Sequence, residues 1–319
     1  MYIYANGNAY EGSWLDDQKN GQGTLRYASG DIYEGSWIDD KKGQGIYTYA
    51  NGAVYEGSWL DDKMHGRGVL RYTSGDVYEG CFEYGKKNGK GKYAYATGNT
   101  YEGNWMDDKR FGQGTLTYTS GSIYKGNWRG DKRSGNGTYT FANNDVYKGN
   151  WRDDMRSGQG TLTYANGDVY NGKWTGSKRH GEGTLSFANG SVYEGSWKSG
   201  KYSGYGILSD SSGDTYKGGW LDGKRSGKGI LKYDNGDVYE GIWLNDMEDG
   251  KGTLTYADGR YYTGTWKCGS KDGQGTFVYA NDSVYIGSLI NGIPHGQGRL
   301  TRTDGSTVEG RWNNGMLSG

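Results

Sequence analysis

Apolar and aromatic residues recur at fixed places in a repeating segment of 23 residues. In the segment from Tyr101 to Ile123, Tyr101 and Trp105 lie two positions either side of Gly103, and Leu116 and Tyr118 alternate with polar residues further on. Side chains along a strand point to alternate faces of a sheet. Each run therefore predicts a half-buried strand, and the two runs predict a β-hairpin with its rings and Leu116 on one face. No stretch has a period of 3.6 residues, so we expect no helix.

This repeat organises the whole chain. The opening tyrosine recurs every 23 residues from Tyr10 to Tyr285, with one shorter step of 22 residues from Tyr33 to Tyr55. All 12 tryptophans occupy the fifth position of a repeat, and most of the 62 glycines fall in four columns. We predict one array over residues 1–319, with a half repeat at 1–9, full repeats starting between Tyr10 and Tyr285, and a partial repeat at 308–319.

A lone hairpin cannot bury its apolar face, but stacked hairpins can. The predicted fold is therefore all-β: an elongated single-layer antiparallel sheet, or solenoid, of about 13 tandem hairpin repeats and roughly 26 to 28 strands. Asn51-Gly52 and similar pairs predict type I′ turns between hairpins. Asn144 and Asp282 replace glycine in that column, and both residue types tolerate a positive φ. Within each hairpin, segments such as Asp107–Gly112 predict a longer loop.

Composition and charge exclude several classes of protein. A 15% aromatic content argues against simple disorder, and a single proline excludes collagen. The 37 basic and 37 acidic residues balance, so no net field draws the chain to nucleic acid, and we expect no nucleic-acid partner. No apolar run is long enough to span a bilayer, and the N-terminal residues do not resemble a signal peptide. Two cysteines suit a reducing compartment, so we expect a cytoplasmic location.

Side chains that could support catalysis or bind metal are dispersed. His65, His180 and His295 occupy the same position of repeats that are five repeats apart, too distant for one metal site or a catalytic relay. Cys81 and Cys268 are eight repeats apart, which excludes a disulfide if the sheet is correct. Paired aspartates beside lysine supply too few oxygens for Ca²⁺. We therefore expect no enzyme activity, no catalytic residues, no metal and no cofactor.

Two surfaces could bind partners. The aromatic stripe is mainly a packing surface, but a single-layer sheet would leave it open as a groove for an apolar segment. The predicted groove residues are Trp105, Trp128, Trp151, Trp174, Trp197, Tyr124, Tyr147 and Tyr170. The loop side carries a basic row that is either a mixed, solvated edge or a site for anionic lipid or an acidic protein. Its residues include Lys109, Arg110, Lys132, Arg133, Lys178, Arg179, Lys224 and Arg225.

The motif Tyr-Glu-Gly-x-Trp, followed by Gly-x-Gly and Tyr-x-x-Gly-x-x-Tyr, resembles the MORN repeat (membrane occupation and recognition nexus). Matching segments include Tyr10–Gly30 and Tyr101–Gly121. The resemblance implies hairpins that form an elongated groove for proteins, and in some members for phospholipids. The chain departs from the motif mainly near its C-terminal end. The departures are Leu289, Pro294, Arg302 and Val308, with Asp210 in mid-chain.

Proteins built only of MORN repeats include radial-spoke head proteins of cilia and cytoskeletal scaffolds of protists. The resemblance therefore favours a non-enzymatic scaffold in a cytoskeletal assembly, with the axoneme of a cilium or flagellum as the favoured location. Its partners would be other proteins of that assembly, and its open sheet edges could support a homodimer or end-to-end contacts. The alternative is a peripheral membrane module that binds anionic phospholipids or phosphoinositides through the basic row. A third reading is a targeting fragment of a larger enzyme.

Overall fold

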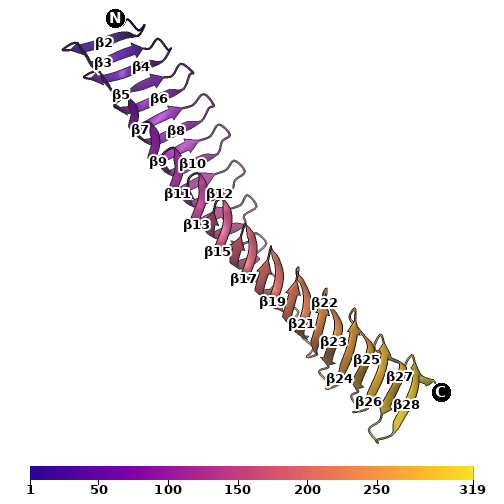
Figure 1. Ribbon diagram of the computed structural model, residues 1–319. Coiled ribbons are helices and arrows are strands. Elements are labelled where there is room, and N and C mark those ends of the chain that lie inside the picture. Colours follow the sequence, from indigo (N-terminus) through magenta and orange to yellow (C-terminus); the bar gives the residue numbers. More distant parts are fainter. Residues whose placement is uncertain (319) are drawn as a thin grey trace. The chain divides into compact units, whose positions relative to one another are not determined.

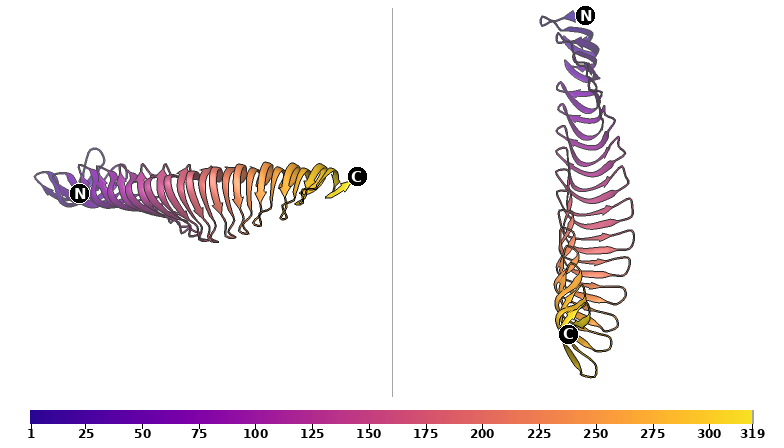
Figure 2. Two further views of the ribbon diagram at one scale, coloured as in Figure 1. Left: turned by 90° about the horizontal axis from the view of Figure 1, so that it is seen from below. Right: turned by 90° about the vertical axis from the view of Figure 1, so that its right-hand side faces the viewer.

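The computed structural model describes residues 1–318, and its regular elements are all β-strands (Figure 1). Gly319, the last residue of the predicted partial repeat, lies outside the described residues. The chain forms two compact units, Met1–Arg156 (unit 1) and Ser157–Gly319 (unit 2), and each is described by itself. Within each unit every strand pairs antiparallel with its neighbours in sequence (Figure 2).

The strands of unit 1 begin close to the N-terminus. They are β1 (Tyr2–Ile3), β2 (Ala9–Leu15), β3 (Gln18–Arg26), β4 (Ile32–Ile38), β5 (Lys41–Thr48), β6 (Val54–Leu60), β7 (Lys63–Arg71), β8 (Val77–Glu83), β9 (Lys86–Ala94), β10 (Thr100–Met106), β11 (Lys109–Thr117), β12 (Ile123–Arg129), β13 (Lys132–Thr140) and β14 (Val146–Arg152). β15 (Met155–Thr163) begins at the end of this unit and lies mostly in the next.

The remaining strands belong to unit 2. They are β16 (Val169–Thr175), β17 (Lys178–Ser186), β18 (Val192–Lys198), β19 (Lys201–Ser209), β20 (Thr215–Leu221), β21 (Lys224–Lys232), β22 (Val238–Leu244), β23 (Met247–Thr255), β24 (Tyr261–Lys267), β25 (Ser270–Val278), β26 (Val284–Ile290), β27 (Ile293–Thr301), β28 (Thr307–Asn313) and β29 (Met316–Ser318). The short strands β1 and β29 bring the number above the predicted 26 to 28. None of residues 1–318 forms a helix long and apolar enough to cross a membrane.

Strand pairing puts the rings on one face, as predicted. Tyr101 of β10 lies opposite Leu116 of β11, and Leu116 in turn lies opposite Tyr124 of β12. Directly opposed residues in antiparallel strands project from the same face of the sheet. We call the face that carries the tyrosines and tryptophans the aromatic face, and the opposite one the polar face. The register shifts between Gly103 and Trp105, where a bulge gives β11 extra residues.

The two kinds of turn are the reverse of the prediction. Asp107 and Asp108 both have positive φ, 48° and 66°, and Met106 pairs directly with Lys109. Two successive positive φ values in a two-residue loop define a type I′ turn, so the predicted longer loop over Asp107–Gly112 is wrong. The residues after Asp108 continue β11 because they pair with β12.

The turn between hairpins is not type I′. In the turn at Asn51-Gly52, only Gly52 has positive φ, at 92°, and its N–H donates to the Tyr49 carbonyl at 2.8 Å. This geometry is a type I turn followed by a residue in the left-handed region. Asn144 and Asp282 adopt the same conformation, at 69° and 60°. The prediction of positive φ for that column is therefore confirmed, although the predicted turn type is wrong.

Glycine in the strands allows a close approach by the tyrosine ring. The Tyr101 ring lies over Gly103 and Gly114, where a Cβ atom would come within 2.5 Å and 2.3 Å of its hydroxyl oxygen. That hydroxyl donates to the Asn104 carbonyl at 3.0 Å. The sequence suggested that these glycines make room for rings of neighbouring strands. For Gly114 the prediction is confirmed, because the ring comes from the neighbouring strand β10, whereas Gly103 lies under a ring of its own strand.

The short repeat, residues 33–54, lacks one residue, and this shortens the pairing of its second strand with the next repeat. In regular repeats a glycine lies opposite the next tryptophan, as Gly112 lies opposite Trp128. β5 is one residue shorter, and its pairing with β6 begins only at Gln44 and Ser58. The indole N–H of Trp59 is buried and has no hydrogen-bond partner among residues 1–318.

Candidate interaction surfaces

Each tryptophan is held by the repeat before it and by its own repeat. The Trp128 ring contacts Tyr124 and Tyr101 edge-to-face, with centroids 5.1 Å and 5.4 Å apart. Its indole N–H donates to the Gly114 carbonyl at 3.2 Å. Edge-to-face contacts and a satisfied indole N–H are the usual requirements for a buried tryptophan. Unit 2 repeats the arrangement at Trp197, whose indole donates to the Gly183 carbonyl at 2.9 Å.

The eight predicted groove residues are buried. Exposure is no more than 6% for any of the set Trp105, Trp128, Trp151, Trp174, Trp197, Tyr124, Tyr147 and Tyr170. The expectation that a single-layer sheet leaves this face open is therefore wrong for these side chains. The tyrosine rings lie flat over glycines, and cationic side chains cover tryptophans. The structure gives these residues a packing role, and their contact with a partner stays a prediction.

Burial also changes the acidity of the tyrosines. It raises the pKa of Tyr147 and Tyr170 to about 12, although the cations Arg156 and Arg179 oppose the shift. Removal from water disfavours the charged tyrosinate, which accounts for the direction. These hydroxyls therefore stay protonated in the folded chain over the physiological range.

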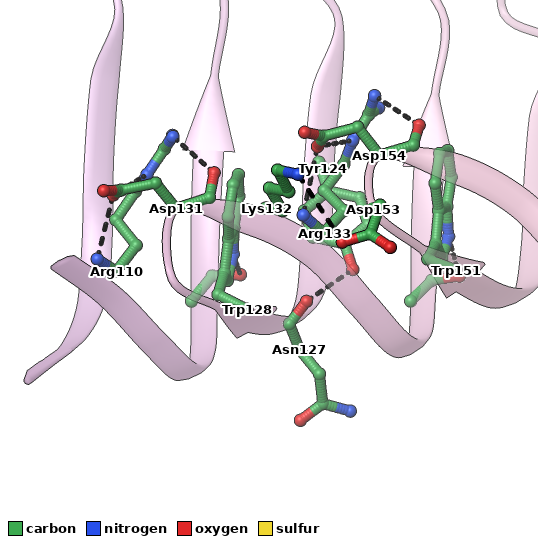
Figure 3. Close-up of polar contacts among 12 residues, drawn as sticks. Arg110, Tyr124, Asn127, Trp128, Asp131, Lys132, Arg133, Trp151, Asp153 and Asp154 are labelled. Carbon is green, nitrogen blue, oxygen red and sulfur yellow. Dashed lines mark hydrogen bonds and ion pairs between the residues drawn. The ribbon is translucent and has the colours of Figure 1, made fainter.

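The predicted basic row divides into two structural classes. Arg110 and Arg133 lie over the indole rings of Trp128 and Trp151, with the guanidinium carbon 4.2 Å and 4.4 Å from the ring centroids (Figure 3). The Nε atom of Arg110 also pairs with Asp131 Oδ1 at 3.1 Å. Cation–π contact and ion pairing hold these side chains against the aromatic face.

Unit 2 has the same arrangement. Arg179 lies 4.3 Å from the Trp197 centroid, and Arg225 lies 4.2 Å from that of Trp243. The other half of the predicted row, Lys109, Lys132, Lys178 and Lys224, is exposed at the strand ends. Lys132 pairs with Asp153 at 3.6 Å. Of these eight residues, only the four lysines are exposed, and Lys132 among them already pairs with Asp153, so lipid binding through this row stays a prediction.

The polar face contains an open hollow in each unit. The hollow in unit 1 has a volume of about 980 Å³, a floor of glycines, and walls that include Glu56, Glu79, Glu102, Arg67 and Lys92. We call it the unit 1 trough. Its charged residues have both signs and alternate along the sheet. This surface is mainly hydrophilic.

The unit 2 trough differs in character. Its volume is about 970 Å³, and its lining includes Tyr205, Ile230, Ile242 and Ile286. Tyr205 and Ile286 are each 56% exposed. Three lysines and one glutamate complete the charged part of the lining: Lys217, Lys228, Lys251 and Glu240. Exposed apolar side chains gathered in a hollow are typical of interaction sites.

The unit 2 trough is not among the predicted surfaces, although the repeat columns contain a signal for it. Ile242 stands in a column that mostly holds Ser, Asn or Thr. Ile286 stands in a column that mostly holds Glu or Lys, and Tyr205 stands in a column that mostly holds Gln, Lys or Arg. Apolar departures in polar columns point to a local surface that differs from the rest of the sheet.

The remaining candidates for metal binding or catalysis are histidines and cysteines. Within residues 1–318, no group of three or more His, Cys, Asp or Glu side chains could hold a metal ion. Cys81 and Cys268 are free thiols. The His65 ring contacts Tyr84 edge-to-face at 5.4 Å.

Comparison with known proteins gives one family and several weak structural likenesses. The SAS-4 TCP domain of Drosophila melanogaster, in complex with a proline-rich motif of Ana2, has a TM-score of 0.30 and 16% identity, covering 62% of this chain and 95% of that chain. The TCP10 domain of Danio rerio CPAP has a TM-score of 0.23 and 12% identity, covering 84% and 99%. Such low scores carry no argument about function. No curated protein matches the chain significantly.

The MORN repeat family model matches thirteen consecutive segments. They are residues 10–32, 33–54, 55–77, 78–100, 101–123, 124–146, 147–169, 170–192, 193–215, 216–238, 239–259, 262–284 and 285–307. These segments follow the tyrosine period, and each spans one hairpin with its turns. The chain therefore belongs to the MORN-repeat family.

Proposed function

We propose that this chain is a non-enzymatic scaffold that binds segments of partner proteins on its polar face. The observation that carries the proposal is the contrast between the faces. The rings of the aromatic face are occupied by packing, whereas Tyr205 and Ile286 are exposed in the unit 2 trough. Tyrosine is a favoured anchor in protein interfaces.

The charge of the unit 2 trough selects the partner. Lys217, Lys228 and Lys251 outnumber Glu240 in its lining, and none of these lysines forms an ion pair within residues 1–318. The proposed occupant is an acidic segment that also carries apolar side chains. Its apolar groups would cover Ile230 and Ile242, and its carboxylates would meet the lysines.

Membership of the MORN family supports a cytoskeletal setting for this scaffold. The proposed location is the axoneme of a cilium or flagellum, in a radial-spoke-like assembly, because the chain resembles proteins built only of MORN repeats. A homodimer or an end-to-end contact would extend such an assembly. The second candidate, binding of anionic phospholipids, is favoured by one observation, the exposed lysine row of Lys109, Lys132, Lys178 and Lys224.

The trough is tested with synthetic peptides that combine leucine with glutamate, and with charge-inverted peptides that combine leucine with lysine. We expect the full chain to bind the acidic peptides, and the double variant Tyr205→Ser/Ile242→Ser to lose at least tenfold in affinity. Gln113→Ser is the matched control, because Gln113 occupies the column of Tyr205 in unit 1. Equal binding of both peptide classes, or unchanged binding by the double variant, would overturn the proposal.

The cellular setting and the lipid alternative need separate measurements. Wild-type chain and the double variant are compared for the proteins that each retains from a native extract. We expect cytoskeletal proteins that bind through acidic segments to be retained by the wild type alone. Vesicles containing phosphoinositide test the alternative: strong binding that is lost with salt and in Lys109→Glu/Lys132→Glu would favour the membrane module instead.

A further inference from the structure

In most repeats the chain supplies a cation to its own aromatic face. The side chain at the tenth position of a repeat lies over the tryptophan of the next repeat. Arg110 over Trp128 and Arg225 over Trp243 are examples, both with the guanidinium carbon 4.2 Å from the ring centroid. Lysines do the same, and Lys87 Nζ also donates to the Tyr72 hydroxyl at 3.2 Å. Aromatic faces carry negative potential, which favours a cation at this place.

One repeat of unit 2 reverses the charge at this position. Glu248 lies opposite Trp243 in the strand pairing, as Arg225 lies opposite Trp220 in the repeat before it. Its carboxylate accepts a hydrogen bond of 3.4 Å from Tyr233, the counterpart of Tyr72. An anion beside aromatic rings is disfavoured by their negative faces. Glu248 therefore occupies a place that the fold prepares for positive charge.

The usual internal ion pair is also absent at this repeat. Arg110 and Arg225 pair with Asp131 and Asp246, each 21 residues further on. The residue 21 positions after Glu248 is Gly269, where a Cβ atom would lie 3.6 Å from Glu248 Oε2. The result is a single carboxylate with open space beside it. Neither member of the internal pair is present.

The open space is a hollow of about 340 Å³. Its lining includes Tyr233, Tyr239, Glu248 and Trp266. The Tyr239 and Trp266 rings meet edge-to-face, with centroids 5.0 Å apart, and form one wall. Lys271 borders the hollow, and its ammonium lies 5.7 Å from the Trp266 ring centroid, farther than the 4.2 Å of Arg110 from Trp128. That ammonium is hydrogen-bonded to Tyr256 and makes no ion pair with Glu248 within residues 1–318.

We propose that the hollow beside Glu248 binds the guanidinium group of an arginine side chain from a partner protein. The guanidinium would stack on Trp266 as Arg110 stacks on Trp128, and its N–H groups would donate to the Glu248 carboxylate. A planar cation with several donors fits an aromatic wall and a carboxylate better than an ammonium does. The inference rests on the proposed function only in taking the arginine from a protein. The hollow is on the aromatic face, so its test is independent of the trough.

The probe is methylguanidinium, added to the ¹⁵N-labelled full chain, with the tryptophan indole N–H signals followed by NMR. Trp266→Phe assigns the Trp266 signal. We expect a saturable shift of that signal at millimolar concentration, and no shift of the Trp128 signal, because Arg110 already covers that ring. Methylurea, which has a similar shape and no charge, should cause no saturable shift.

Two variants at position 248 make the test decisive. Glu248→Arg should supply the cation internally and abolish the saturable shift, while Glu248→Gln should weaken methylguanidinium binding at least fivefold. N-acetyl-arginine amide should bind as methylguanidinium does if an arginine side chain is the ligand. Absence of a saturable Trp266 shift in the wild type, or an equal shift in Glu248→Arg, would overturn the inference. Neither outcome depends on whether acidic peptides bind the trough.

Discussion

The two faces of the sheet differ in how much they vary from repeat to repeat. On the aromatic face, the tyrosine over its two glycines recurs in both units, and in most repeats a cation lies over the next tryptophan. On the polar face, the same columns hold Glu and Lys around the unit 1 trough, and Ile and Tyr in the unit 2 trough. The comparison assigns the aromatic face to folding, and it is the polar face on which we propose that partners bind.

The two faces vary to different degrees because their side chains contact different numbers of repeats. Trp128 contacts tyrosines of two successive repeats and hydrogen-bonds a strand of the earlier one. A change at that residue therefore affects two hairpins. A side chain such as Tyr205 projects into an open hollow and can change without disturbing its neighbours.

The largest expected effect is on the aromatic face. Trp128→Ala should lower the free energy of unfolding by about 3–5 kcal/mol, because it leaves a cavity and an unpaired Gly114 carbonyl. Urea titration measures the loss, and hydrogen exchange should place it in the hairpins around Trp128. The matched control is Gln113→Ala on the polar face, expected within about 0.5 kcal/mol of wild type. Similar losses in both variants would remove the distinction between the faces.

The second-largest effect is expected at alkaline pH, which should lower the free energy of unfolding through the tyrosines of the aromatic face. Burial raises the pKa of Tyr33, Tyr147, Tyr170 and Tyr216 to about 12, whereas an unfolded tyrosine titrates near pH 10. Above pH 10 the unfolded chain loses protons that the folded chain retains. Stability is therefore complete below pH 10 and falls as the pH rises towards 12.

The free energy of unfolding is measured between pH 8 and pH 11, at pH values about one unit apart. Tyr147→Phe should flatten the decline slightly, because it removes one titrating group while keeping the ring. A chain whose stability is constant up to pH 11 would contradict the assignment of these tyrosines to a water-free layer.

A smaller effect on stability is expected in the basic row, where substitutions of two adjacent residues should differ in their cost. Arg110→Ala should cost about 1–2 kcal/mol, since it removes a cation–π contact and an ion pair with Asp131. Lys109→Ala should change stability by less than about 0.5 kcal/mol, because Lys109 is exposed. Thermal unfolding of the two variants side by side measures the difference. A larger loss from Lys109→Ala would show that the row is not divided as described.

The smallest effect on stability is expected in the unit 2 trough. Tyr205→Ser should stay within about 0.5 kcal/mol of wild type, because its ring is 56% exposed. The same change should weaken binding of an acidic peptide. Calorimetric titration and thermal unfolding on the same sample measure both quantities, and a clear fall in the melting temperature would assign Tyr205 to folding instead.

Strands and faces could be predicted because their signals are local. Two-residue alternation around Tyr101 and Leu116 fixed the hairpin and its buried side, and Asn144 and Asp282 identified a column of positive φ. The turn type could not be predicted from Asp107–Gly112, because polar residues that continue a strand look like a loop until their partners on β12 are known.

The closure of the aromatic face could not be predicted for a similar reason. Arg110 covers Trp128, which lies 18 residues away in the next repeat, and the alternation within one strand shows nothing of that contact. The trough depends on which side chains the strand pairing brings together, as well as on the residue in each column. Its apolar residues are visible as departures from their columns, but the hollow that gathers Tyr205, Ile242 and Ile286 is not.

The cation of one repeat over the tryptophan of the next has a mechanical consequence. These contacts link each such hairpin to the next one along the sheet. A unit pulled along the stacking direction should therefore unfold one hairpin at a time. Each 23-residue hairpin that peels off lengthens the chain by roughly 80 Å at full extension. Under load such an array would absorb work in even steps, and force spectroscopy would record a regular sawtooth.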